Sequence, residues 1–257
     1  MIHLGIAGAS GRLGQRVLQQ ALQQKNFRVA GAYVSENSDH LNQDISAMVG
    51  GDYIDISFTA ITENAFPQPV DVVVDFSLPS AFDELVDTCV LHQTPLVSGT
   101  TGLTAEQFDR LGQASKFIPV MWTSNFSINI QMIKNLLNII RMKNDVQEIR
   151  IIETHHIHKQ DMPSGTAISL AQELSLERTL KKTDEQVFQL GDVQIESIRE
   201  GEVPGTHRIE IILPHEKLVI EHQALTPGLF AQGALQAAEW LADKPLGLYS
   251  LNDFLLQ

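Results

Sequence analysis

Cysteine is nearly absent from this chain. Cys89 is the only one among 257 residues, so no internal disulfide can form. That scarcity favours a reducing compartment. Together with Leu85, Val86 and Val90, Cys89 follows a helical spacing that predicts the buried face of a helix. We therefore interpret Cys89 as a core residue and not as a nucleophile.

Long apolar runs and basic residues are also scarce. No apolar run approaches the ~20 residues that a membrane-spanning helix needs, and the first residues lack the cationic segment of a secretory signal. Lysine and arginine number 18 against 31 acidic residues, which gives a formal net charge of −13. Such an acidic balance argues against nucleic-acid binding and against a polybasic membrane contact. We therefore expect a cytoplasmic protein without nucleic-acid or membrane partners.

The first half of the chain alternates strand and helix patterns, without internal repeats or low-complexity tracts. Apolar and β-branched runs predict strands at 2–7, 27–34, 70–76, 95–98 and 118–123. Helical spacing of apolar residues predicts helices from Leu13 to Leu22, at about 80–92 and at 103–114, whereas 35–53 is polar and irregular. Repeated β-α-β alternation implies a parallel sheet with right-handed crossovers. We therefore predict an α/β fold with a Rossmann-type parallel sheet.

The regular alternation of predicted strands and helices ends near Asn125. Patterns predict a long helix at 128–140, a strand at 148–154, a helix at 167–174, several strands within 184–223, a helix at 233–242 and a short terminal segment at 248–256. We predict a dinucleotide-binding domain over 1–125, completed by 228–257 after a second crossing at Thr226-Pro-Gly228. Residues 126–227 then form a substrate-binding domain with few crossovers.

A glycine-rich turn joins the first predicted strand to the first helix. It reads Gly8-Ala-Ser-Gly11-Arg-Leu-Gly14. Glycines there let the backbone approach a pyrophosphate, and the helix start offers unpaired N–H groups and a positive dipole end. The alternative is a tight turn without a ligand. The position at the first β-α junction favours dinucleotide binding.

Different residues near the predicted cofactor site favour different nicotinamide dinucleotides. Glu36, close to the end of the second strand, is suited to the ribose hydroxyl of NADH, whereas Ser35 is not; Arg12 is suited to the 2′-phosphate of NADPH. We predict use of both NADH and NADPH. The loops Phe76-Ser77 and 98–102 follow other strand ends, where a cofactor crevice forms.

Residues 153–167 hold the densest group of reactive side chains. The segment reads Glu-Thr-His-His-Ile-His-Lys-Gln-Asp-Met-Pro-Ser-Gly-Thr-Ala. A zinc site is one interpretation, with His156 and His158 converging from a strand. The chain, however, has one thiol and no H-E-x-x-H pattern, so we predict no metal. A structural cluster is the second interpretation, and acid catalysis on a carboxylated substrate is the third, because histidine titrates near neutral pH and a helix start binds carboxylates.

This segment resembles the signature of the 4-hydroxy-tetrahydrodipicolinate reductase (dihydrodipicolinate reductase) family. The resemblance covers nearly the whole chain. Its other motifs are Gly8 to Gly14, 98–102, Ser124-Asn-Phe-Ser127, Ser197-Ile-Arg-Glu-Gly201, Gly205-Thr-His207 and Phe230-Ala-Gln-Gly-Ala234. It implies a C-terminal α+β domain on an open mixed sheet that builds a homotetramer. It also implies NAD(P)H-dependent reduction of a cyclic hydroxy-imine dicarboxylate with loss of water, in lysine and diaminopimelate biosynthesis.

The resemblance also implies roles for individual residues. His155 becomes the proton donor and Lys159 its catalytic partner, while His156, Gly165 and Thr166 bind the substrate. Together with the strand-end residues above, the expected cofactor contacts are Gly8, Ala9, Ser10, Gly11, Arg12, Leu13, Ser35, Glu36, Phe76, Ser77, Gly99, Thr100, Thr101, Thr123, Ser124, Asn125 and Phe126.

Two positions depart from the family pattern. An acidic residue often stands where this chain has Ser35, and Ser-Arg usually stands where it has Thr226-Pro227. We expect these changes to alter cofactor affinity without abolishing catalysis. His158 and Asp161 are expected to contact the site residues and hold them in position, without contacting the substrate themselves. Two alternative functions remain. The chain could be another amino-acid dehydrogenase, or a dinucleotide sensor without catalytic activity.

Overall fold

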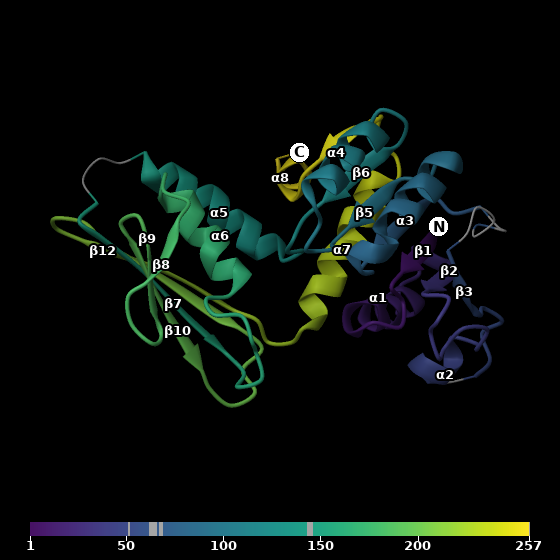
Figure 1. The fold of residues 1–257 in the computed structure, drawn as a ribbon, viewed down its shortest axis with the longest axis horizontal. Helices are drawn as coiled ribbons and strands as arrows, with labels where there is room; N and C mark the ends of the chain where they lie inside the picture. Colours follow the sequence, from purple (N-terminus) through teal and green to yellow (C-terminus); the bar gives the residue numbers. More distant parts are fainter. Residues whose placement is uncertain (51, 62–65, 67–68, 143–145, 257) are drawn as a thin grey trace. The chain divides into compact units, whose positions relative to one another are not determined.

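The computed structural model describes residues 1–50, 52–61, 66, 69–142 and 146–256 (Figure 1). The chain forms two compact units. The first unit comprises residues 1–126 and 228–257, and the second comprises 127–227.

The first unit is built on a seven-stranded sheet in the order β13-β6-β5-β4-β1-β2-β3, and all its pairings are parallel. Its strands are β1 (Ile2–Ala7), β2 (Phe27–Val34), β3 (Phe58–Ala60), β4 (Val72–Asp75), β5 (Leu96–Ser98), β6 (Pro119–Trp122) and β13 (Gly247–Tyr249). Its helices are α1 (Arg12–Gln23), α2 (Ser46–Val49), α3 (Pro79–Leu91), α4 (Ala105–Ala114), α7 (Gly228–Leu241) and α8 (Leu251–Leu255). The predicted Rossmann-type parallel sheet is confirmed.

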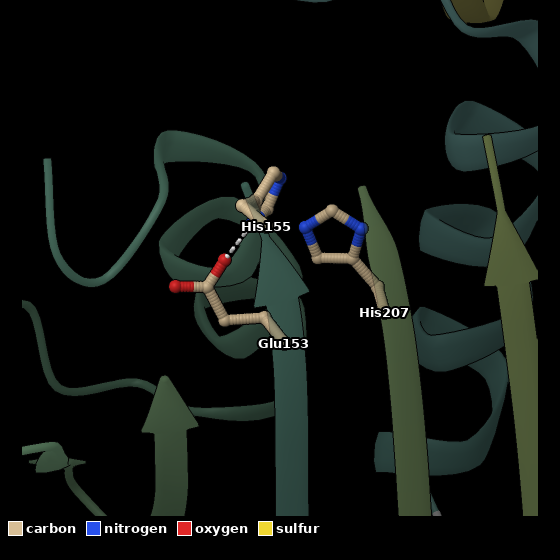
Figure 2. Close-up of side chains that lie close together, drawn as sticks. All are labelled: Glu153, His155 and His207. Carbon is tan, nitrogen blue, oxygen red and sulfur yellow. Dashed lines mark ion pairs between the residues drawn. The ribbon is translucent and has the colours of Figure 1, made fainter. Parts of the chain in front are cut away.

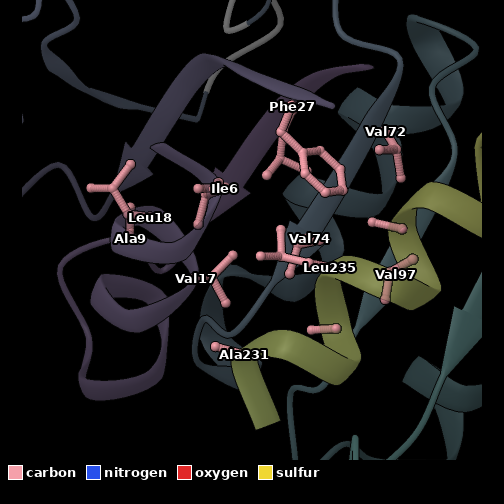
Figure 3. Packing of buried hydrophobic residues seen from close by; sticks show 14 of the residues in the cluster. Ile6, Ala9, Val17, Leu18, Phe27, Val72, Val74, Val97, Ala231 and Leu235 are labelled. Atoms are coloured by element: carbon pink, nitrogen blue, oxygen red, sulfur yellow. The ribbon is translucent and has the colours of Figure 1, made fainter. Parts of the chain in front are cut away.

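Apolar clusters cover both faces of this sheet. On one face, α1 and α7 pack together, and Figure 3 shows Val17 and Leu235 from these helices against Val74 of the sheet. On the other face, α3 and α4 contribute Leu85 and Leu111 to a second cluster. Strands buried on both sides explain the continuous apolar runs in the sequence. The helix α7 thus joins the N-terminal sheet although it lies near the end of the chain.

The second unit is a six-stranded mixed sheet in the order β12-β11-β7-β10-β9-β8. Its elements are α5 (Ile128–Arg141), β7 (Glu148–His155), α6 (Gly165–Leu174), β8 (Leu180–Lys182), β9 (Val187–Leu190), β10 (Val193–Arg199), β11 (Thr206–Ile212) and β12 (Lys217–Gln223). The β7–β10 pair is parallel and the other pairs are antiparallel. Alternate residues of each central strand, such as Ile151 and Ile209, pack in one cluster with α5 and α6. The predicted mixed sheet is also confirmed.

The irregular segment predicted at 35–53 contains more structure than expected. The short helix α2 lies within it, an isolated bridge joins Asp44 to Ser57, and β3 follows as an edge strand. Asp44 explains this order, because its carboxylate accepts hydrogen bonds from the backbone of Ser46, Ile54 and Ile56. These elements are too short for a hydrophobic period to reveal. Among the described residues, no helix has the length and apolar character needed to cross a membrane.

Candidate functional site

A cavity of about 520 Å³ opens beside the glycine-rich turn in the first unit. The strand order reverses between β1 and β4, so the loops that follow these two strands diverge at the sheet's carboxyl edge. Ligands of open parallel sheets bind at such a switch point. The turn after β1, the end of β2 and the loop after β4 line this cavity.

Two glycines of the turn cannot be replaced without steric conflict. Gly8 has a φ of +69°, and a Cβ there would lie 2.4 Å from the carbonyl oxygen of Phe76. A Cβ on Gly14 would lie 2.1 Å from the carbonyl oxygen of Gly8. The backbone is therefore folded tightly onto the start of α1, where Gly11 is the N-cap residue.

Seven of the predicted cofactor residues line this cavity. They are Gly8, Ser10, Gly11, Ser35, Glu36, Phe76 and Ser77. Its lining also includes Glu84 and contains no lysine or arginine among the described residues. The other predicted cofactor residues do not line it: Ala9, Arg12, Leu13, Gly99, Thr100, Thr101, Thr123, Ser124, Asn125 and Phe126. Ala9 and Phe126 belong to the apolar core.

The side chain of Thr100 is committed to the protein itself. Its hydroxyl donates to Asp75 Oδ2 at 2.8 Å, and Ser98 donates to the same oxygen at 2.7 Å. The backbone N–H of Ser77 donates to Asp75 Oδ1. All three side chains, those of Asp75, Ser98 and Thr100, are buried. Asp75 thus links the loops after β4 and β5, a role that was not predicted from the sequence.

In the second unit, the histidine segment begins at the end of β7. His155 is the last residue of that strand, and Glu153 lies two residues before it on the same buried face. The cross-strand partners of Glu153 are Ser197 on β10 and His207 on β11, and His207 in turn faces His222 on β12. A row of polar side chains therefore crosses four strands of an otherwise apolar sheet face.

Glu153 is the most heavily bonded member of this row. Its Oε2 forms an ion pair with His155 Nδ1 at 2.5 Å (Figure 2), and neither of these two atoms has a hydrogen-bond partner among the described residues. Its Oε1 accepts hydrogen bonds from both terminal nitrogens of Arg199 and from the backbone N–H of Ser164, each at 3.1 Å. Burial would raise the pKa of Glu153, but the neighbouring His155, Ser197 and Ser164 lower it to about 2. The carboxylate is therefore ionised at neutral pH although its side chain is fully buried.

His207 is held in the opposite state. Its ring lies edge-on to that of His155, with centroids 5.1 Å apart, and its Nε2 lies 3.2 Å from Ser164 Oγ. Burial, followed by the nearby His155, lowers the pKa of His207 to about 3, against the raising effect of Glu153. His207 is therefore neutral at physiological pH.

The loop after β7 carries the remaining predicted residues. Lys159 donates a 2.7 Å hydrogen bond to Asp161, and His158 pairs with Glu202 at the surface. His156 has a buried Nδ1 without a hydrogen-bond partner among the described residues. His156 and His158 lie beyond the end of β7, yet their rings lie side by side with centroids 6.0 Å apart. Among the described residues, however, neither belongs to the group of side chains close enough to hold a metal ion.

The helix α6 begins directly beside this loop. Ser164 is its N-cap residue, and the Ser164 hydroxyl accepts from the Ala167 backbone N–H. The predicted substrate residues Gly165 and Thr166 are the first two residues of α6. His155, Lys159 and the start of α6 thus lie along one loop, which brings a histidine and an ammonium group to a helix start that can stabilise a carboxylate.

Among the residues that the structure describes, three side chains lie close enough together to hold a metal ion, namely Glu153, His155 and His207. Glu153 already pairs with Arg199 and His155, so a cation there would compete with an arginine. The donor set therefore fits an ion-pair cluster better than a metal centre.

No role was predicted from the sequence for Glu153, Arg199 or His207. Alternation along β11 could have identified His207, because it shares a face with Ile209 and Ile211 in the core. The partnership of Arg199 with Glu153 depends on the parallel β7–β10 pairing, which no local pattern predicts.

Comparisons with known proteins agree over the whole chain. The family described as dihydrodipicolinate reductase, N-terminus, matches residues 2–126, and the family described as dihydrodipicolinate reductase, C-terminus, matches 127–255. The chain is 35% identical to the 4-hydroxy-tetrahydrodipicolinate reductase of Rickettsia bellii, over 99% of this chain and 94% of that protein. It is 32% identical to the enzyme of the same name from Sulfurimonas denitrificans, over 99% of both chains.

A solved structure shares the fold. The dipicolinate-bound dihydrodipicolinate reductase from Paenisporosarcina sp. TG-14 superposes with a TM-score of 0.80 at 20% identity, covering 97% of each chain. An amine dehydrogenase from Mycobacterium smegmatis gives a TM-score of 0.66 at 10% identity, covering 98% of this chain and 95% of that one. The architecture is thus shared with dehydrogenases of other names.

Proposed function

The chain belongs to the dihydrodipicolinate reductase family, and on that basis we propose that it reduces 4-hydroxy-tetrahydrodipicolinate to tetrahydrodipicolinate with loss of water. The observation that carries this proposal is the grouping of His155, Lys159 and the start of α6 around one loop. The reaction serves lysine and diaminopimelate biosynthesis.

The first unit is suited to a nicotinamide dinucleotide. The start of α1, directly after Gly11, offers backbone N–H groups to a pyrophosphate. Ser35 and Glu36 line the same cavity and are proposed to hold a ribose. The cofactor, when bound, supplies the hydride. NADH and NADPH are both proposed, with the two carboxylates of Glu36 and Glu84 in the cavity lining favouring NADH, because they repel a 2′-phosphate.

The second unit is suited to hold and protonate a cyclic dicarboxylate. We propose that Lys159, His156, Gly165 and Thr166 bind its carboxylates, since an ammonium group and a helix start both stabilise negative charge. Loss of the substrate hydroxyl as water gives a conjugated imine, and hydride addition to that imine leaves an electron pair that must take up a proton. His155 is proposed to give that proton from Nε2, because Nδ1 faces Glu153.

Two further proposals concern the protein in the cell. Ile152, Ile198 and Ile212 lie half-buried on the sheet face opposite α5 and α6, which supports a homotetramer built through that face. A cytoplasmic location is proposed because the substrate and product belong to biosynthetic metabolism.

The variants His155→Gln and Lys159→Ala separate the reductase from a dinucleotide sensor. We expect each to lower kcat by about 10²-fold or more, while the dissociation constant for NADH, measured by fluorescence, stays within twofold of wild type. Turnover that survives in both variants would show that the catalytic assignment is wrong.

A further inference from the structure

We propose that Glu153 is a positioning residue, whose carboxylate fixes the His155 ring so that its proton leaves from Nε2. Glu153 and His155 share a face of β7, and Glu153 Oε2 lies 2.5 Å from His155 Nδ1 (Figure 2). A carboxylate at one ring nitrogen keeps the proton there and sets which nitrogen faces the substrate. The identity of the reaction rests on the proposed function, but this pairing does not.

The other ring nitrogen is left for the substrate. No described residue hydrogen-bonds His155 Nε2. Gly205 lies beside it, and a Cβ at that position would be 2.9 Å from Nε2. Glycine therefore keeps a side chain out of the space next to the atom that gives the proton.

The carboxylate is itself held from the other side. Arg199 and the Ser164 backbone donate three hydrogen bonds to Oε1, which leaves Oε2 on the side of His155. Arg199 also balances the charge of Glu153. The buried pair therefore stays neutral whether His155 carries its proton or has given it away, which a proton donor requires at each turnover.

His207 does not compete for this carboxylate. It is the direct cross-strand partner of Glu153, but its Nε2 lies 3.2 Å from Ser164 Oγ and its ring is neutral. Within the described part of the chain, His155 is thus the one imidazole paired with Glu153.

Nitrogen-15 NMR of histidine-labelled wild-type protein tests the pairing without any variant or substrate. We expect the neutral His155 ring to carry its proton on Nδ1. A neutral ring with its proton on Nε2 would overturn the proposal. Because this readout needs no turnover, it stands even if the wild-type protein fails to reduce the proposed substrate.

The variant Glu153→Gln tests the effect on the reaction. We expect kcat to fall by about 10- to 100-fold with KM within about threefold. The loss of kcat/KM at alkaline pH should begin about one pH unit lower, because the imidazolium loses a buried negative neighbour. Glu153→Asp keeps the negative charge. In this variant the loss of kcat/KM at alkaline pH should begin within about half a pH unit of the wild-type value.

Glu173→Gln is the matched control, since Glu173 is another part-buried acid of the second unit, paired with Lys134 on α5. It should leave both kcat and the pH profile unchanged. A folded Glu153→Gln protein whose pH profile superimposes on that of Glu173→Gln would contradict the proposal.

Discussion

Lys159 donates a 2.7 Å hydrogen bond to the carboxylate of Asp161, two residues further along the same loop. Burial would raise the pKa of Asp161, but Lys159 and the backbone of Gly165 lower it. Asp161 is therefore ionised and faces the two groups that we propose for a substrate carboxylate, the Lys159 ammonium and the start of α6. A substrate carboxylate must compete with Asp161 for them.

Replacing Asp161 by asparagine should remove this competition. The Asp161 side chain is 56% exposed, so its pairing with Lys159 is weak. We expect the substrate KM to fall by about two- to fivefold, the value of an exposed ion pair, while kcat stays within about twofold of wild type. Steady-state kinetics at low ionic strength measure this. A higher KM would mean instead that Asp161 holds Lys159 in its binding position.

The acidic cavity of the first unit should favour NADH. Repulsion of a 2′-phosphate by Glu36 costs on the order of 1 kcal/mol or more, so we expect kcat/KM for NADH to exceed that for NADPH by about 5- to 50-fold. Glu36→Gln should narrow this ratio, whereas Glu239→Gln, on the exposed side of α7, should not. A ratio that favours NADPH would contradict the assignment of this cavity.

Adding a methyl group at Gly14 of the glycine-rich turn tests whether cofactor binding depends on the close backbone approach there. Gly14 and Gly112 are both helical glycines, but only Gly14 meets a backbone oxygen, at 2.1 Å, when a Cβ is added. Gly14→Ala should weaken NADH binding by about tenfold or more and destabilise the first unit by about 1–3 kcal/mol. Gly112→Ala should stabilise the protein by about 0.5–1 kcal/mol. Calorimetry and NADH titration measure both, and equal effects would contradict the close approach at Gly14.

Acid should destabilise the second unit from pH 6.5 downwards. His207 has a pKa of about 3 in the fold against 6.5 for an ordinary histidine. The unfolded chain therefore binds the proton first, and the free energy of unfolding falls as pH drops from 6.5 to 3, by at most about 1.4 kcal/mol per pH unit. Glu153, with a pKa of about 2 against 4.5, adds a second loss below pH 4.5.

His207→Gln should flatten this dependence between pH 6.5 and 4.5, and His215→Gln, at an exposed turn, should not. Urea unfolding followed by circular dichroism measures the whole chain. Trp122 and Trp240 both lie in the first unit, so their fluorescence follows that unit separately. An unchanged slope in the His207 variant would show that His207 is not the group responsible.

The sequence predicted the parts of this fold that a hydrophobic period can reveal. The apolar runs at 2–7 and 27–34 became β1 and β2, and the strands predicted within 184–223 include β10, β11 and β12. It did not predict α2 or β3, which are four and three residues long and depend on the side chain of Asp44. Local patterns cannot reveal elements held by contacts of this kind.

The candidate site divides in the same way. The segment 153–167 was predicted to be reactive because its histidines and lysine lie beside a helix start, and the roles of His155 and Lys159 were predicted from the family resemblance. The partners of Glu153 come from β10 and β11, 46 and 54 residues further along, and only the strand register brings them together. Similarly, Asp75 was part of an apolar run, and its link to Ser98 and Thr100 depends on the pairing of β4 with β5.

The most direct test of the proposed function is a coupled assay with the purified protein. Aspartate semialdehyde, pyruvate and the upstream synthase generate the substrate, and the absorbance of NADH or NADPH at about 340 nm follows its reduction. We predict oxidation of the cofactor that depends on the synthase and on this protein together. No substrate-dependent oxidation with either cofactor would contradict the assignment of this chain as a 4-hydroxy-tetrahydrodipicolinate reductase.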